Sequence, residues 1–148
     1  MLRVRQKDGL TYGVSSQLSA GEIDHAGHFG ISATAAPENL AMVEAAIEDE
    51  LQRAIRDGFS AQEVARAQSG IAQRRLQSRT GDGALAAAWT RNLFLQRSFA
   101  WTQALDEKIA ALTPEQVNAA FAKYVRADKL TVIVAGDEAK ATKTLKGP

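Results

Sequence analysis

A succession of helix signals between Pro37 and Tyr124 constrains the fold of this 148-residue chain more than any other feature. Start and stop residues divide this stretch into five segments of helical length. The first segment carries apolar residues at spacings of three and four, which places them on one helix face: Leu40, Val43, Ile47, Leu51 and Ile55. The pattern predicts helices over residues 37–57, 61–79, 84–96, 100–111 and 114–124.

The helix ends are marked by particular residue types. Gly58 follows the first helix, and glycine is the usual residue just past a helix C-terminus. Ser60 and Glu63 have the spacing of a capping box, in which each side chain bonds the other residue's backbone N–H. Thr113 and Gln116 repeat that spacing, so the second and fifth helices have well-defined starts.

Strand patterns flank the helices. Residues 11–20 and 27–35 are rich in small and β-prone residues, and the turn-forming residues between them predict an antiparallel hairpin. Residues 129–135, KLTVIVA, are β-branched and predict a third strand. The resulting fold class is α+β, with an antiparallel sheet packed against several helices. Three strands are few for five helices, so partner strands are expected to be missing.

The chain is predicted to be a single domain, residues 1–148, truncated at its N-terminus. Its length suits one domain with a hydrophobic core. Residues 2–7 resemble the last turns of a helix that ends at Gly9, and the beginning of that helix is not in the sequence. A cut sheet has unpaired edges, which predicts self-association or pairing with another chain.

Composition excludes several classes of function. The formal net charge is +1, from 18 basic and 17 acidic side chains, which gives no basic footprint for nucleic acid. The apolar runs are too short to insert into a membrane. The chain contains no cysteine, so disulfides, thiolate metal sites and a cysteine nucleophile are ruled out.

Arg5 and Tyr12 are the first candidate pair for chemistry. They lie seven residues apart around Gly9, where the predicted helix gives way to the predicted strand. A guanidinium and a phenol on one side of this corner offer hydrogen-bond donors to a carbonyl oxygen or an oxyanion. The spacing also fits a structural interpretation, in which Arg5 complements the helix dipole and Tyr12 packs on the strand.

Other candidates favour structural roles. His25 and His28 are the only two histidines, too few for a zinc site without further ligands. Arg74, Arg75 and Arg79 form a basic patch, for which a solvated face or ion pairs are predicted.

The tryptophans also favour a structural role. Trp89 lies at helical spacing from Leu85 and Leu93. This pattern predicts that Trp89 and Trp101 belong to the core rather than stacking on a ligand.

The corner around Gly9 resembles the signature of the C-terminal, non-zinc domain of pitrilysin-type (inverzincin) metallopeptidases, an Arg-Glu-Lys-x-Gly-Leu-Ala-Tyr-Ser-Val run. The matching residues are Arg5, Lys7, Gly9, Leu10, Tyr12 and Val14. Further agreement follows in the same order at 58–64 (GFSAQEV), 112–117 (LTPEQV), Tyr124 and 130–137 (LTVIVAGD). The resemblance covers nearly the whole chain and implies the half-domain fold of the pitrilysin and processing-peptidase group.

This resemblance implies a role in peptide hydrolysis. In the family, zinc is bound by an H-x-x-E-H helix in a homologous N-terminal domain. That motif is absent from this sequence, so the chain is expected to carry no cofactor and to be inactive alone. Its expected partners are the zinc-bearing N-terminal domain or subunit and a peptide substrate. The resemblance assigns Tyr12 as the catalytic donor to the oxyanion and Arg5 as a substrate-binding residue.

Two alternatives to this function remain at the level of sequence. The first alternative is a non-catalytic structural or assembly homologue of the same fold. The second is an unrelated α+β binding module. The presence of both Arg5 and Tyr12 favours the peptidase interpretation over a scaffold. The resemblance further suggests a parent protein in the periplasm or cell envelope.

Overall fold

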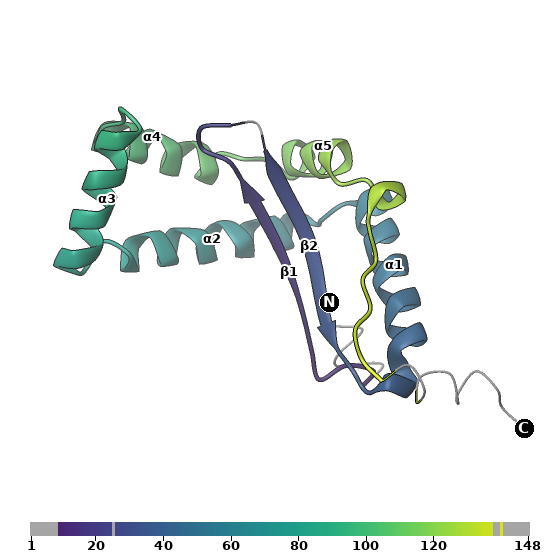
Figure 1. Ribbon diagram of the computed structural model, residues 1–148. Helices are drawn as coiled ribbons and strands as arrows, with labels where there is room; N and C mark the ends of the chain where they lie inside the picture. The colour runs from purple at the N-terminus through teal and green to yellow at the C-terminus, as the bar shows by residue number, and fades with distance from the viewer. Residues whose placement is uncertain (1–8, 25, 138–139, 141–148) are drawn as a thin grey trace, which may run out of the picture. The chain divides into compact units, whose positions relative to one another are not determined.

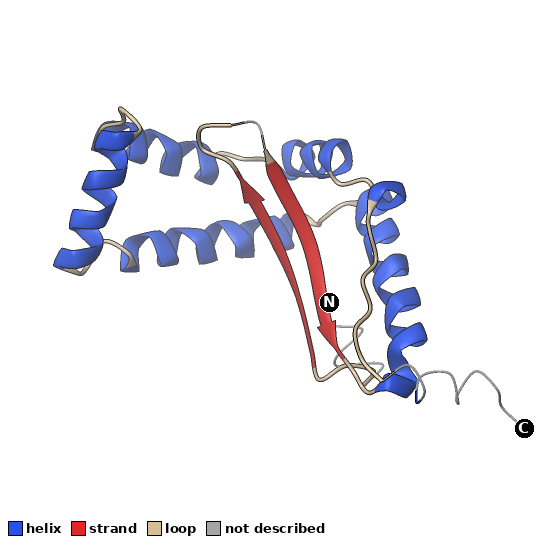
Figure 2. Ribbon diagram, in the orientation of Figure 1, coloured by secondary structure: helices blue, strands red, loops and turns tan. Residues whose placement is uncertain are grey.

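The structure is a computed structural model that describes residues 9–24, 26–137 and 140. It contains an antiparallel hairpin and five α-helices (Figures 1 and 2), which confirms the predicted α+β class. The chain divides into two compact units, one of residues 1–57 with 122–148 and one of residues 58–121.

The hairpin of the first unit has one apolar and one polar face. Strands β1 (Gly13–Ala20) and β2 (Gly27–Thr34) pair antiparallel, with Ser16 opposite Ile31. Residues directly opposite one another project to the same face of a sheet. The pair of Leu18 and Phe29 therefore shares a face with Ile31, whereas the pair of Ser19 and His28 lies on the other.

The prediction of a third strand at 129–135 is wrong. Ala127–Lys129 form a short 3-10 helix, η3, and the following residues form no strand, as Figure 2 shows. Ile133 is 86% exposed. β-branched residues favour extended backbone, but a strand exists only when a neighbour accepts and donates its backbone hydrogen bonds. Within the described residues, the sheet consists of β1 and β2 alone, and neither strand pairs with residues 130–135.

Helix α1 (Leu40–Asp57) supplies most of the buried residues described in the first unit. The predicted helix from Pro37 begins instead with a 3-10 turn, η2 (Pro37–Asn39), before the α-helix proper. The buried side chains are Val43, Ala46 and Leu51 from α1, together with Val125. Val43 and Leu51 belong to the predicted apolar face, so that face is confirmed as the side that packs.

The second unit contains the remaining helices. They are α2 (Ala61–Gln77), α3 (Asp82–Phe94), α4 (Phe99–Ala110) and α5 (Pro114–Tyr124), the last continuing three residues into the first unit. Each lies within two residues of its predicted bounds. Of the described residues, no helix is both long and apolar enough to cross a membrane.

The predicted start and stop signals are confirmed. Ser60 N–H donates to Glu63 Oε2 at 2.8 Å, and Glu63 N–H donates to Ser60 Oγ at 3.3 Å. Thr113 and Gln116 make the same reciprocal pair at the start of α5. Gly58 has φ of +72°, the left-handed conformation that glycine adopts without strain.

Asn118 holds the segment before α2 against α5. Its Oδ1 accepts from the Phe59 N–H at 2.8 Å, and its Nδ2 donates to the Phe59 carbonyl oxygen at 3.1 Å. The Phe59 and Phe121 rings meet edge to face, with centroids 5.0 Å apart. A single side chain thus satisfies both backbone groups of Phe59, a residue whose segment has no helix or strand partner of its own.

The capping box of α2 yields the first testable prediction. Replacing Ser60 by Ala removes the acceptor for the Glu63 N–H, so the free energy of unfolding is expected to fall by about 1 kcal/mol. Urea denaturation followed by helix circular dichroism measures the loss. Ser69→Ala, on the exposed interior of the same helix, is the matched control and is expected to cause none. Equal effects of the two substitutions would contradict a specific capping role.

The prediction that Trp89 and Trp101 are core residues is wrong. Their exposed fractions are 58% and 42%, and Leu93 beside Trp89 is 67% exposed. The Trp89 ring meets the Phe99 ring edge to face at 5.1 Å. An apolar stripe on a helix is buried only where another element covers it. Among the described residues of the second unit, the buried hydrophobic residue is Val64 of α2.

Candidate functional site

The predicted corner before β1 is held by its backbone. Gly9 has φ of +62°, which glycine adopts without strain, and the helix predicted before it lies outside the described residues. Tyr12 N–H donates to the Thr34 carbonyl oxygen at 2.8 Å and so extends the hairpin by one bond. Asn39 Nδ2 donates to the Leu10 carbonyl oxygen at 3.5 Å. These contacts fix the path of the chain on both sides of Thr11.

Tyr12 has a fixed backbone and a free side chain. Its side chain is 74% exposed, so the predicted packing role on the strand is not what the structure shows. A phenol in this position can donate a hydrogen bond to another molecule. Arg5 lies outside the described residues, so the convergence of Arg5 and Tyr12 stays a prediction.

Thr11 is a feature of the corner that the sequence did not reveal. It is only 8% exposed, and its hydroxyl has no hydrogen-bond partner within the part of the chain that the structure describes. An unsatisfied buried hydroxyl costs about 1–3 kcal/mol, which is unusual outside functional or strained positions. No sequence signal identified it, since the burial of a single threonine is not encoded in a local pattern.

His28, the histidine that the structure describes, belongs to no candidate metal site. His28 is exposed on the polar face of the hairpin, and His25 lies outside the described residues. Among the residues that the structure places, no group of three or more His, Asp, Glu or Cys side chains could hold a metal ion.

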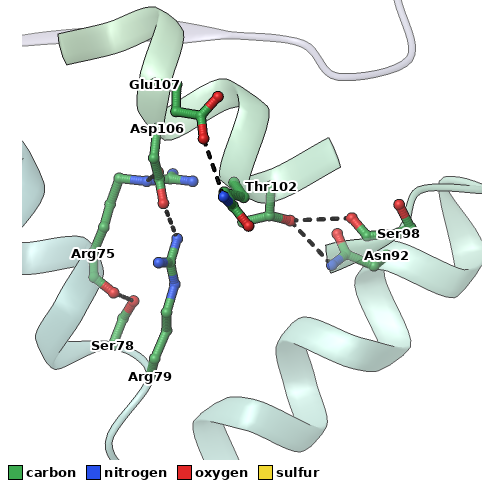
Figure 3. Close-up of polar contacts among 9 residues, drawn as sticks. Arg75, Ser78, Arg79, Asn92, Ser98, Thr102, Asp106 and Glu107 are labelled. Carbon is green, nitrogen blue, oxygen red and sulfur yellow. Dashed lines mark hydrogen bonds and ion pairs between the residues drawn. The ribbon is translucent and has the colours of Figure 1, made fainter. Parts of the chain in front are cut away.

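The basic patch on α2 forms ion pairs within the second unit, as predicted. Arg75 Nε and Arg79 Nη2 donate to the two carboxylate oxygens of Asp106 on α4, and Figure 3 shows both side chains directed at that carboxylate. Arg75 lies in the last turn of α2, and Arg79 lies in the turn that follows the helix. The cluster therefore links α2 to α4.

A second group of polar contacts in Figure 3 links α3 to α4. Asn92 Nδ2 donates to Thr102 Oγ1 at 3.3 Å, and Thr102 Oγ1 donates to the Ser98 carbonyl oxygen at 3.5 Å. Gln103 Nε2 donates to Glu107 Oε1 at 3.0 Å within α4. These neutral bonds orient the helices but bring no nucleophile beside a base, so they do not constitute a catalytic site.

The ion pairs of Arg75 and Arg79 with Asp106 predict that the protein loses stability in acid. The bond from Arg79, followed by that from Arg75, holds the pKa of the Asp106 carboxyl below its ordinary value of 3.8, and partial desolvation opposes this shift. When the pKa of a carboxyl group is lower in the folded than in the unfolded state, the group stabilises the fold at every pH above its unfolded-state pKa. This stabilisation is lost as the pH falls through the folded-state pKa. The free energy of unfolding is therefore expected to decrease below about pH 4.

Chemical denaturation between about pH 6 and pH 3 measures this decrease. Asp106→Asn removes the titrating carboxyl and is expected to flatten this part of the profile. An unchanged pH profile in the variant would show that other carboxyl groups cause the acid sensitivity.

Comparison with known proteins identifies the class of domain. Residues 1–71 match the family model described as the peptidase M16 inactive domain. The fold is similar to the crystal structure of a peptidase M16 inactive domain from Pseudomonas fluorescens, with a TM-score of 0.74 and 25% sequence identity. That similarity covers 87% of this chain and 30% of that one. No curated protein matches.

The α+β fold and residues 1–71 are thus similar to the peptidase M16 inactive domain, which confirms the resemblance to a C-terminal, non-zinc domain. The chain spans less than a third of the length of the structure it matches.

Proposed function

We propose that this chain is the substrate-binding, non-zinc part of a zinc-dependent metalloendopeptidase. In this proposal the zinc is held by an N-terminal homologous domain or subunit, which also activates the attacking water. Tyr12 donates to the carbonyl oxygen of the scissile peptide bond as it becomes an oxyanion, and Arg5 positions the peptide.

The observation that carries the proposal is the geometry of Tyr12. Its backbone is anchored to the hairpin through Thr34, whereas its phenol is 74% exposed. A donor that acts on a bound peptide must be accessible, and it is most effective when its position is fixed before the substrate arrives. Tyr12 is accessible, and its backbone position is fixed by the bond to Thr34.

The alternative is a structural or assembly homologue that keeps the fold without taking part in hydrolysis. The description of the matching family as inactive is compatible with it. A scaffold, however, has no chemical reason to keep both Arg5 and Tyr12. We therefore favour the peptidase role.

The test uses the complete reading frame from which this chain comes. The expected result is cleavage of a mixed peptide pool that stops on chelation and returns with added zinc. This chain alone, the matched control, is expected to cleave nothing. Cleavage that continues in the presence of a chelator would contradict the assignment as a zinc peptidase. Absence of cleavage by the complete protein would favour the structural homologue.

Partners and location follow from the same proposal. The zinc-bearing domain or subunit and a peptide are the expected partners, and the periplasm or cell envelope is the expected site of action. The hairpin edges of the first unit further suggest pairing with a second copy. Sedimentation velocity at rising concentration tests this pairing, and a persistent monomer would contradict it.

A further inference from the structure

A groove runs between α2 and α4 within the second unit. Its volume is about 500 Å³. Along α2 its lining extends from Gln68 to Leu76, and Arg79 follows in the turn after the helix. An α-helix rises about 12 Å between Gln68 and Leu76, and about four residues of extended peptide have this length. The groove lies away from the Tyr12 corner in sequence, and the catalytic proposal does not use it.

The lining of the groove changes in chemical character from one end to the other. Gln68 and Ser69 make the first end polar and uncharged, and Arg75 and Arg79 make the other end cationic. Between them lie the apolar side chains of Ile71, Ala72, Leu76 and Ile109. Leu76 is 66% exposed, so its apolar surface is available to an occupant.

The cationic end carries an excess of positive charge. Two guanidinium groups share the one carboxylate of Asp106, and the side chains of Arg75 and Arg79 are 30% and 39% exposed. A guanidinium has five N–H donors. Arg75 uses Nε and Arg79 uses Nη2, and the described residues offer no further acceptor to either side chain. A second carboxylate would use these donors and bring the cluster to neutrality.

We propose that this groove binds the C-terminal residue of a peptide. The terminal carboxylate lies on Arg75 and Arg79, and an apolar last side chain lies against Leu76 and Ile109. The preceding residues extend toward Gln68 and Ser69. A fatty acid would match the charged end equally well. At the far end Gln68 Nε2 already donates to backbone carbonyl oxygens of residues 109, 110 and 112, but the Gln68 amide oxygen and the Ser69 hydroxyl suit peptide amide groups rather than a hydrocarbon tail.

This inference deepens the proposed function and rests on it for the choice of a peptide as ligand. The binding experiment requires no cleavage. The two proposals can therefore fail separately.

The experiment titrates the full chain with acetyl-alanyl-alanyl-leucine and follows backbone amide signals by NMR. Saturable shifts are expected at residues 68–79 and 106–110. The same peptide with a C-terminal amide is expected to bind at least about tenfold more weakly, because a charge-assisted pair is lost. Equal affinity of acid and amide, or absence of binding, would overturn the proposal. Octanoate binding as tightly as the peptide would overturn the choice of a peptide.

Variants separate the groove from general charge effects. Arg79→Gln is expected to weaken binding of the free acid at least tenfold. Arg66→Gln, an exposed arginine of α2 that does not line the groove, is the matched control and is expected to change nothing.

Asp106→Asn keeps both guanidinium groups and removes their carboxylate, so binding is expected to be retained or strengthened. This variant decides the question if Arg79→Gln fails to fold. Weaker binding in Asp106→Asn with an intact fold would contradict the proposal.

Discussion

Replacing Tyr12 by Phe in the complete protein is expected to lower turnover by on the order of a hundredfold, with little change in the fold. Phenylalanine keeps the ring and removes only the hydroxyl. The backbone bond from Tyr12 to Thr34 does not depend on the side chain and remains. The expected loss is that of one donor to an oxyanion, an interaction made in the transition state, so kcat is expected to fall more than KM changes.

The chain offers a matched control for this substitution. Tyr124 is the second tyrosine, and its side chain is 73% exposed, nearly the same as that of Tyr12. Tyr124→Phe is expected to leave turnover unchanged. Steady-state kinetics on one peptide, with circular dichroism to confirm folding, compares the two variants.

The outcomes discriminate between the two functions proposed for the chain. A loss confined to Tyr12→Phe supports the catalytic role. Unchanged turnover in an active parent would contradict that role and favour the structural homologue.

Replacing Leu51 by Ala is expected to destabilise the first unit by about 2–5 kcal/mol. Leu51 is 5% exposed and belongs to a small set of buried residues with Val43, Ala46 and Val125. Truncation removes apolar contacts and leaves a cavity that such a small core has few large side chains to fill. Amide signals of α1, followed during urea denaturation, report the loss in this unit.

Met42→Ala is the control for the Leu51 prediction. Met42 lies on the same helix, but its side chain is 48% exposed. Its replacement is expected to change the free energy of unfolding by about 0.5 kcal/mol or less. Comparable losses in both variants would contradict the assignment of Leu51 to the core.

The candidate site was predicted only in part. The residue types at Arg5 and Tyr12, read with the resemblance, pointed to the corner, and the structure adds that Tyr12 is exposed on a held backbone. The buried hydroxyl of Thr11 and the groove beside Arg79 had no sequence signature. Both depend on residues brought together from separate elements.

The sequence by itself determined where the helices begin and end. Ser60 with Glu63, Gly58 and Pro114 act through bonds and dihedral angles within a few residues, and such local effects are present in the sequence. Only the tertiary structure decided that residues 130–135 pair with no described strand and that Trp89 is exposed. Strand pairing and burial both require neighbours from distant parts of the chain, and apolar or β-branched character cannot specify whether those neighbours are present.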